Sequence, residues 1–506
     1  MILSQTQSKK REVLWLLGAV TTALILRCLF LTKESLWLDE IASWQFASRD
    51  LYWAFHAEAT NPPLYYVLLH FWIQLFGTSE AALRSLSIFP GLGSVVLVYL
   101  IGRRLFSSPI ALMAAWYLAI CSFQVYYSQE ARAFALLSFL VLVSTLLLIV
   151  GAETASAHAR MGCFFGYAVV TALSLYTHFI AVFYFAAHGL YVVLRKPKIR
   201  AVITAWSVAA SCALLAFLPW LRVMLHTASE GGQIRRYIWL KIPQAYFSFM
   251  FGDTLVPLDE RAVRDISGTL KANAAILFLA AAATVMLFPF CVTALRRFRA
   301  GALLTLMMAV GPVLMAFAVS LHVPFFDERY LIASSPFVYL IVATGATEAF
   351  EQWQQRRDGL KVFVGTLGTA LYTALVLYSL GNYYFGARFG REQWREAILV
   401  LETRAEQHDL VLFEPDYLKG CYQYYRRGHL LYWALTPQRA ERIISREPSV
   451  LETLSSHLRV WLVRSHYEDD RLLDTLRQIF RESEHFVFPK AKGIEIYGFW
   501  TSGRRR

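Results

Sequence analysis

The sequence predicts a mainly helical membrane protein that crosses the bilayer many times and ends in a small α/β domain outside it. Hydrophobic residues make up 57% of the 506 residues and charged residues 17%, against about 45–50% and about 25% in soluble domains. A soluble particle of this size could not bury so much apolar surface behind so few charges. Aromatic residues reach 15%, which excludes a disordered chain.

Charge and cysteine usage exclude two other classes of protein. The net charge is +13, but the Lys and Arg residues form short clusters between apolar runs, which is typical of the cytoplasmic connections that orient transmembrane helices. No basic stripe with interleaved aromatic residues follows a polar segment, so a nucleic-acid partner is not expected. The six cysteines have no metal-binding spacing, and five of them lie in or beside apolar runs, so neither a zinc site nor a disulfide framework is expected.

The first two apolar runs decide the predicted topology. A transmembrane helix needs about 20 apolar residues. Val13–Leu31 follows three basic residues at positions 9–11, and no small-residue cleavage site follows, so a retained anchor with a cytoplasmic N-terminus is favoured over a cleaved signal peptide. Leu64–Phe76 is too short to span. We expect it to lie on the outer surface, because a crossing there would place Arg103 and Arg104 outside.

The remaining apolar runs alternate across the membrane and bring the predicted total to about eleven spans. Cys163–Leu194 is too long for one span and is predicted to form a hairpin near Thr177 and His178. After the last predicted span, the chain leaves the membrane on the outer side at Tyr384. The other predicted spans are Ser87–Ile101, Ile110–Tyr127, Phe134–Val150, Val202–Leu225, Ala274–Leu295, Ala302–Leu321, Leu331–Ala349 and Val362–Tyr384.

The composition becomes polar after residue 384, which predicts a membrane domain over 1–384 and an extramembrane α/β domain over 385–506. Apolar periodicity there favours helices and strands in alternation. The predicted helices are Arg391–Gln407 and Asp469–Glu484, and the predicted strands are Leu410–Glu414, Val460–Val463 and Ile494–Phe499.

Candidate functional residues gather in the loops that this topology places on the outer side. Several carboxylates, a histidine, arginines and aromatic side chains in one compartment are the usual content of an active site. Each has an ordinary explanation too: loop carboxylates are often merely solvated, and a surface pair such as Glu130 with Arg132 commonly contributes little. The candidates are Trp37, Asp39, Glu40, Asn61, Arg84, Glu130, Arg132, His178, Arg329 and Tyr330.

The order of these loop motifs resembles the protein O-mannosyltransferase-like branch of the GT-C glycosyltransferases. The motifs are W-x-D-E after the first run, then N-P-P-L-Y-Y, A-L-R-S-L-S, Y-S-Q-E-A-R and, late in the chain, E-R-Y-L. They are specific only as a set, and they cover about the first two-thirds of the chain. That branch includes bacterial relatives that add sugars to lipid A and to the lipopolysaccharide core. The segment R-E-Q-W-R-E-A also resembles the start of the outer domain of many bacterial members.

The resemblance implies a GT-C fold and an inverting transfer of a sugar from a polyprenyl-phosphate donor to a hydroxyl group of a lipid, glycan or protein. The reaction is expected on the outer face of the plasma (inner) membrane. The family's acidic residues fall on Asp39, with Glu40 beside it, and on Glu130. Its phosphate-binding arginines correspond to Arg84, Arg132 and Arg329. Trp37, Asn61, His178 and Tyr330 are expected to contact substrate.

The chemistry of the residues agrees with this expectation. An acceptor hydroxyl needs a carboxylate to take its proton, and a phosphate leaving group needs positive charge, which arginine supplies through paired hydrogen bonds. A lipid-linked donor needs no nucleotide-binding loop, and no such motif is visible. No cofactor is expected. Asp39, Glu40 and Glu130 could hold a divalent cation, but no acidic triplet has tight spacing, so an essential metal is not favoured.

Two alternatives remain open from the sequence. A transporter or flippase of lipid-linked saccharides would place ionisable groups near the bilayer midplane on paired halves, whereas the charges here cluster at predicted helix ends. A non-catalytic scaffold or sensor would tolerate the loss of both Asp39 and Glu130.

Overall fold

The computed structural model describes the whole chain except residues 1, 57–61, 196–199, 229–237, 258–264, 324, 356–358, 468 and 502–506. The candidate residue Asn61 therefore lies outside the described residues. The chain forms two compact units. The membrane unit contains Met1–Leu29 and Arg49–Phe385, and the C-terminal unit contains Phe30–Ser48 and Gly386–Arg506. The second boundary falls at the predicted change of composition, while Phe30–Ser48 joins the C-terminal unit.

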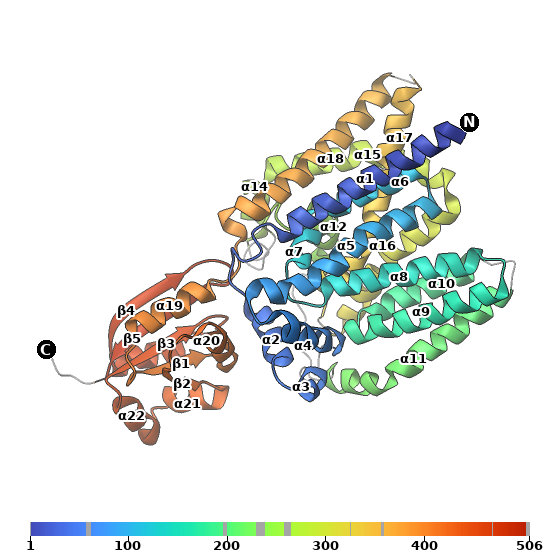
Figure 1. The fold of residues 1–506 in the computed structure, drawn as a ribbon. Helices are drawn as coiled ribbons and strands as arrows, with labels where there is room; N and C mark the ends of the chain where they lie inside the picture. The colour runs from blue at the N-terminus through green and yellow to red at the C-terminus, as the bar shows by residue number, and fades with distance from the viewer. Residues whose placement is uncertain are drawn as a thin grey trace. The chain divides into compact units, whose positions relative to one another are not determined.

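The membrane unit is built from helices (Figure 1). Local signals set their ends: α5, for example, begins where the Ser79 hydroxyl accepts the Ala82 N–H at 3.2 Å and has Arg103 and Arg104 in its last turn. The helices are α1 (Ile2–Cys28), α3 (Leu51–His56), α4 (Leu64–Phe76), α5 (Glu80–Leu105), α6 (Ser108–Ile120), α7 (Ser122–Ser128), α8 (Phe134–Glu153), α9 (Ala157–Thr177), α10 (Ala181–Arg195), α11 (Arg200–Ala228), α12 (Lys241–Phe251), α14 (Ile266–Ala272), α15 (Ala274–Arg297), α16 (Arg299–Ser320), α17 (Ser335–Gln354) and α18 (Gly359–Phe385), with 3₁₀ turns η1 (Ile238–Leu240) and η2 (Glu328–Ser334).

Eight helices of the described chain are long and apolar enough to cross a membrane, or nine if α6 and α7, which meet at a 59° bend, form one span. The prediction of a mainly helical, multi-pass membrane protein is confirmed. The predicted total of about eleven also counts α1 and the 15-residue α10, which are not among these nine. The short helix α4 has the predicted bounds, and the α9–α10 hairpin turns at His178 as expected.

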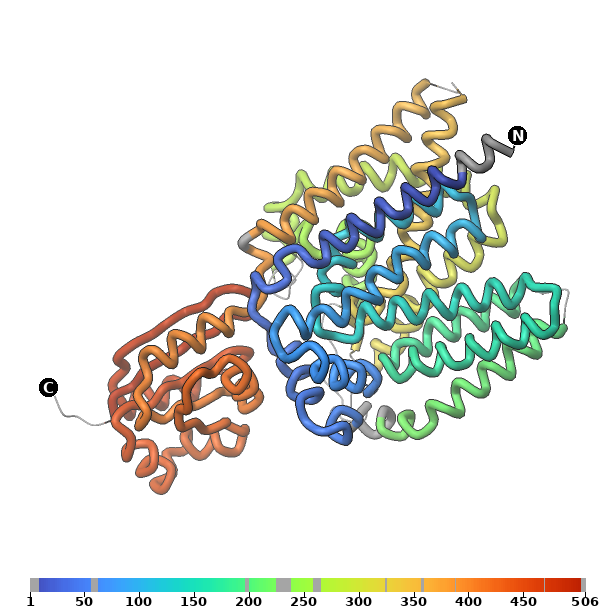
Figure 2. The backbone as a smooth tube through the Cα atoms, in the orientation of Figure 1, coloured from blue at the N-terminus to red at the C-terminus, as the bar shows by residue number. Residues whose placement is uncertain are grey.

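The helices of the membrane unit lie side by side (Figure 2), and their buried side chains form one large apolar core. The core side chains are mainly Ala, Leu, Val, Phe and Tyr. Helix α5 approaches α1 and α7 closely at Gly91, where an added Cβ would lie 2.3 Å from Ser128 Oγ and 3.0 Å from Arg27 Nε. Only glycine permits this approach, which brings polar groups of three helices together.

The C-terminal unit contains a five-stranded sheet in the order β2-β1-β3-β5-β4. The first three strands in that order are parallel, and β5 and β4 pair antiparallel to them. The strands are β1 (Leu410–Glu414), β2 (Leu431–Ala434), β3 (Arg459–Arg464), β4 (Arg481–Phe488) and β5 (Ile494–Trp500), and the helices are α2 (Leu38–Ala47), α19 (Trp394–Arg404), α20 (Lys419–Tyr425), α21 (Pro437–Ile444), α22 (Pro448–Ser455) and α23 (Arg471–Ile479), with 3₁₀ turns η3 (Ala387–Phe389) and η4 (Asp416–Leu418).

The predicted α/β character of this unit is confirmed, with one element wrong. The helix predicted over Asp469–Glu484 corresponds to α23, which ends at Ile479. The residues from Arg481 onward form strand β4 instead. Side chains of β4 alternate between exposed and half-buried, which is the period of a strand that has one face on the core. Strand β2 was not predicted, because four residues give too short a pattern.

Candidate active site

The buried turn at residues 129–132 is held in place by the end of α1. Gln129 Nε2 donates to the backbone oxygens of Leu26, Arg27 and Leu29 at 3.1, 3.0 and 2.8 Å. These carbonyls lie at or beyond the last turn of α1, where a helix has no partners of its own for them. The Gln129 side chain therefore completes α1 and fixes the turn that carries Glu130 and Arg132.

Arg27, in the last turn of α1, contacts the residue just before the turn at residues 129–132. Its side chain is fully buried and donates to Ser128 Oγ at 3.1 Å and to the backbone oxygens of Leu118 and Ala119 at 3.4 and 3.2 Å. These carbonyls lie just before the bend between α6 and α7, where the regular helical hydrogen bonds stop. The buried guanidinium group thus supplies donors to carbonyls at the break between the two helices.

Two further helices, α4 and α5, carry the residues that position Arg132 and Arg84. Tyr65 Oη on α4 lies 3.0 Å from Ser87 Oγ on α5, and Ser87 Oγ donates to the Arg132 backbone oxygen at 3.3 Å. The Arg132 side chain donates to Tyr66 Oη at 3.2 Å. Arg84 lies three residues before Ser87, on the same side of α5. Both arginines are buried, with exposed fractions of 1% for Arg84 and 8% for Arg132.

Arg132 and Arg329 converge on one aromatic ring. Their Cζ atoms lie 5.9 and 5.7 Å from the centre of the Phe134 ring, within the range of cation–π attraction. Arg329 also lies 5.3 Å from the Tyr330 ring. The His178 ring is 4.7 Å from Tyr330 and 6.2 Å from Phe134. We call Arg132, His178 and Arg329 the arginine–histidine cluster.

His178 is a neutral member of this cluster. Its Nδ1 accepts the Ile180 N–H at 3.2 Å, so the ring proton of the neutral form is on Nε2. Burial and the charges of Arg132 and Arg329 lower the pKa of His178 to about 3. Nε2 is buried and has no hydrogen-bond partner among the residues that the structure describes. A buried N–H donor beside two cations is suited to an anionic ligand.

The acidic residues around η2 were not among the selected candidates, and one of them, Asp327, holds Arg329. Asp327 forms an ion pair with Arg329 at 3.3 Å and accepts its backbone N–H at 3.2 Å. Lys241 of α12 lies 3.7 Å from Glu328. Asp253 follows α12, and burial together with the nearby charges of Glu328 and Asp327 raises its pKa to about 8. No sequence motif links these segments, because they come together only through the fold.

The candidate carboxylates divide between the two units. Glu130 belongs to the turn before α8 in the membrane unit and is fully buried. Asp39 and Glu40 are in the first turn of α2 in the C-terminal unit, next to Trp37. Asp39 is half-buried, while Glu40 is fully buried and pairs with Arg391 at 2.9 Å. Among the described residues, no three His, Cys, Asp or Glu side chains are grouped to hold a metal ion.

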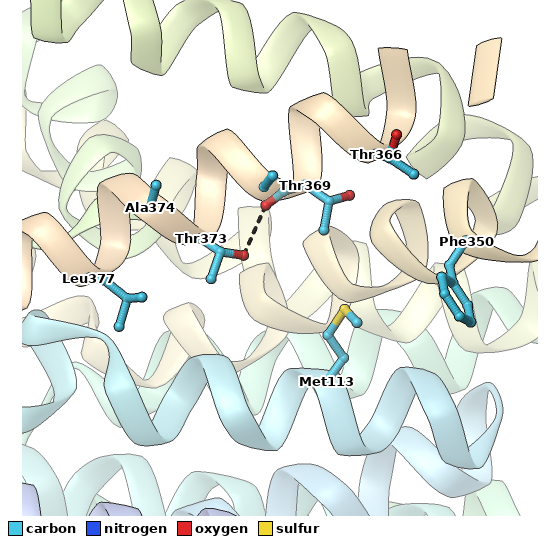
Figure 3. Close-up of a pocket in the computed structure, with 8 residues that line it drawn as sticks. Met113, Phe350, Thr366, Thr369, Thr373, Ala374 and Leu377 are labelled. Atoms are coloured by element: carbon cyan, nitrogen blue, oxygen red, sulfur yellow. Dashed lines mark hydrogen bonds between the residues drawn. The ribbon is translucent and has the colours of Figure 1, made fainter. Parts of the chain in front are cut away.

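A cavity of about 460 Å³ lies elsewhere in the membrane unit, between α6, α17 and α18 (Figure 3). Its Thr hydroxyls donate to carbonyls of their own helix; Thr373, for example, donates to Thr369 O at 2.9 Å. The lining is otherwise apolar, so the cavity suits hydrocarbon rather than a charged group. It contains none of the candidate site residues. It is lined by Met113, Phe350, Thr366, Thr369, Ala370, Thr373, Ala374 and Leu377.

Comparison with known proteins was made for sequence and for fold. Residues 60–222 match the family model described as dolichyl-phosphate-mannose-protein mannosyltransferase. No curated protein sequence matches the chain. The match to residues 60–222 includes the loop motifs that position Arg84, Glu130, Arg132 and His178.

Two solved membrane proteins share the fold along nearly the whole chain. The apo structure of ArnT from Cupriavidus metallidurans is 13% identical, with a TM-score of 0.59, and the match covers 97% of this chain and 98% of that one. ArnT bound to undecaprenyl phosphate gives 14% identity, a TM-score of 0.53 and coverage of 96% and 98%. The oligosaccharyltransferase of Archaeoglobus fulgidus is 11% identical, with a TM-score of 0.59 and coverage of 97% and 74%.

These findings confirm the resemblance that the loop motifs predicted. The family model matches residues 60–222, and the shared fold extends along nearly the whole chain. The chain has the fold of the GT-C glycosyltransferases, and its residues 60–222 carry the sequence pattern of the dolichyl-phosphate-mannose-protein mannosyltransferase family.

Proposed function

We propose that this protein is an inverting glycosyltransferase that moves a sugar from a polyprenyl-phosphate donor to a hydroxyl group of a lipid, glycan or protein. The reaction takes place on the outer face of the plasma (inner) membrane, with the N-terminus in the cytoplasm and the C-terminal unit outside. The observation that carries the proposal is the arginine–histidine cluster, where two arginines and a neutral N–H donor surround one aromatic ring.

The cluster has the chemistry that a phosphate leaving group requires. When the bond between sugar and phosphate breaks, negative charge grows on the phosphate oxygens, and prepositioned donors stabilise it. Arg132 and Arg329 supply charge and paired donors, and His178 adds a third donor without adding a third positive charge. Arg84, buried one helical turn from Ser87, completes the proposed phosphate-binding set. Tyr330 and Trp37 are assigned contacts with the sugar or acceptor.

The carboxylates Asp39 and Glu130 are assigned roles in binding and activating the acceptor. A hydroxyl group attacks the anomeric carbon only as its proton leaves, so a carboxylate within hydrogen-bond reach is required as the base. Asp39 is assigned this role, and Glu130 is assigned a role in orienting the substrate. The ArnT structure with undecaprenyl phosphate supports a lipid phosphate as the donor's leaving group, since that protein shares the fold.

Transfer by purified protein tests the proposal directly. Cells with and without the protein are compared by mass spectrometry of surface lipids and glycans to find the product, and the reaction is then followed with the corresponding donor. Asp39→Asn and Glu130→Gln are expected to abolish transfer while the protein still accumulates in membranes. Glu396→Gln, which changes an exposed carboxylate on α19, serves as the matched control. Unaltered turnover in both site variants would refute the proposal.

A flippase of lipid-linked saccharides is the second candidate, because such a protein would also bind a lipid phosphate. Vesicles that contain the purified protein separate the two functions. Movement of the lipid-linked sugar across the bilayer without any glycosylated product favours the flippase. Product formation that depends on Asp39 favours the transferase.

A further inference from the structure

We propose that the segment Arg391–Trp394, at the start of the C-terminal domain, is a clamp that fixes the helix carrying Asp39, with Arg391 as a positioning residue. The inference rests on the proposed function in one respect, namely that Asp39 acts on the acceptor. It assigns a positioning role to residues 391–394, which no motif connected with the reaction. All of the contacts that support it lie within the C-terminal unit.

The N-cap residue of helix α2 is Trp37, and an indole ring can donate but not accept a hydrogen bond. The N–H groups at the start of the helix therefore need other acceptors. Glu40 Oε2 accepts the Trp37 N–H at 3.4 Å, and Glu392 Oε2 accepts the Leu38 N–H at 3.3 Å. Two carboxylates at a helix N-terminus also match the positive end of its dipole.

Both carboxylates, Glu40 and Glu392, are held in place by further contacts. Arg391 pairs with Glu40 at 2.9 Å, with both side chains buried. Glu392 accepts the Trp394 indole N–H at 2.7 Å and lies 3.1 Å from His466 Nε2. The Glu392 backbone oxygen accepts the Ser35 hydroxyl at 2.6 Å. Glu40 is therefore engaged as a structural anion, and the half-buried Asp39 lies next to it in the same first turn of α2.

The clamp occupies the place where α/β sheets commonly bind ligands. The chain passes from β1 to β2 on one side and then to β3 on the other, so the carboxyl ends of β1 and β3 form a topological switch point. His466 follows β3, and Tyr425 ends the helix after β1. Tyr425 Oη accepts the Leu36 N–H at 2.6 Å. A segment from the N-terminal part of the chain thus packs at this edge, through Glu392 beside His466.

Further contacts lie at both ends of the N-terminal segment that carries α2, at Glu34 and at Gln45. Lys490, in the turn between β4 and β5, lies 3.2 Å from Glu34. Gln45 near the end of α2 donates to Gln423 at 3.1 Å. A Cβ on Gly420 would lie within 3 Å of the Gln45 side chain, so α20 approaches α2 as closely as a glycine allows. The helix is consequently fixed at its start and along its length.

The test combines kinetics with hydrogen exchange on the full-length protein. Arg391→Met leaves the Glu40 carboxylate buried without its partner, which should loosen the first turn of α2. Backbone amides of residues 38–47 should exchange about tenfold faster or more, while amides of β1 and β3 keep their rates. The kcat for transfer should fall about 10–100-fold with an unchanged KM for the donor, because misplacement of a reacting group by about 1 Å has an effect of this size.

Conservative and matched variants make the outcome decisive. Arg391→Lys should restore much of kcat, and Glu392→Gln, which retains an acceptor for Leu38 N–H, gives a milder test if Arg391→Met does not fold. Arg388→Met changes an exposed arginine three residues earlier and should leave both measurements unchanged. Faster exchange in α2 with unchanged kcat would overturn the inference, as would unchanged exchange. Activity in Asp39→Asn would refute the proposed function instead, since the exchange result does not depend on it.

Discussion

The two units use buried arginine in different ways. In the membrane unit, Arg27 donates to the Ser128 hydroxyl and to backbone carbonyls, all of them neutral acceptors. In the C-terminal unit, Arg464 pairs with Glu414 at 2.6 Å and with Asp470 at 2.8 Å. A neutral acceptor fixes a guanidinium group without cancelling its charge, whereas a carboxylate neutralises it.

For the buried arginines Arg132 and Arg464, this difference separates a proposed role in binding from a role in stability. Arg132 donates to the neutral hydroxyl of Tyr66, and its guanidinium group shares the Phe134 ring with that of Arg329. Arg464 compensates the charge of the Glu414 carboxylate within the C-terminal unit. We therefore expect substitutions in the first group to change the reaction, and substitutions in the second group to change the folding free energy.

The largest expected effect is on the reaction, in Arg132→Gln. Loss of one prepositioned donor to a developing charge commonly costs about 10²–10³ in rate, and the amide of Gln keeps a hydrogen-bond donor without the charge. The rate of transfer and the affinity for undecaprenyl phosphate are both measured, since the latter does not require the acceptor. Arg132→Lys should retain part of the activity, because it keeps the charge but not the paired geometry.

The control for this prediction is Arg222→Gln, which removes an exposed arginine from α11. It should change neither rate nor affinity. Thermal stability should fall less in Arg132→Gln than in Arg464→Gln, because Arg132 shares the Phe134 ring with a second cation, Arg329. A large loss of stability without an effect on undecaprenyl phosphate binding would place Arg132 in the structural group instead.

The second effect is on stability, in Arg464→Gln. The Arg464 side chain is fully buried, and its removal leaves Glu414 without its closest cation. Breaking a buried pair commonly costs about 3–5 kcal/mol; with Glu414 only partly buried, we expect about 3 kcal/mol here. Hydrogen exchange of β1 and β3 amides in the full chain measures this opening free energy.

Arg471→Gln provides the comparison within the same unit. Arg471 pairs with Asp469 at 2.8 Å, but its side chain is 63% exposed. Exposed pairs contribute about 0–1 kcal/mol, so the exchange rates should barely change. Equal losses in Arg464→Gln and Arg471→Gln would contradict the role given to burial.

The sequence predicted the elements whose signals are local. Apolar runs located α4 and the α9–α10 hairpin, and β1 has the predicted bounds. The sequence could not assign the loop around Asp39 to the C-terminal unit, because the contact between Glu40 and Arg391 joins residues 351 positions apart. No periodicity or spacing in the sequence reports such a pairing.

The candidate site was predictable only in part, for the same reason. The motifs selected Arg132, His178 and Arg329, and the structure brings these together around Phe134. The supporting groups were missed. Tyr66 ends the N-P-P-L-Y-Y motif but was not selected, because a tyrosine in an apolar helix is usually a core residue, and Asp253 follows an aromatic segment with no motif of its own. Their roles arise from three-dimensional packing, which single residues do not signal.

The smallest expected effect concerns His178 and the pH dependence of stability. Its pKa is about 3 in the folded protein and about 6.5 when it is exposed, so between these values the unfolded chain binds a proton that the folded protein excludes. The free energy of unfolding should therefore fall as the pH is lowered from 6.5 toward 3, by at most about 1.4 kcal/mol per pH unit from this group. Thermal unfolding in detergent at pH 7 and pH 5 measures it, and His178→Gln, which cannot titrate, should show a smaller decrease. An equal decrease in the variant would mean that another group carries the pH dependence, and that the imidazole between Arg132 and Arg329 does not exclude the proton as its neutral role requires.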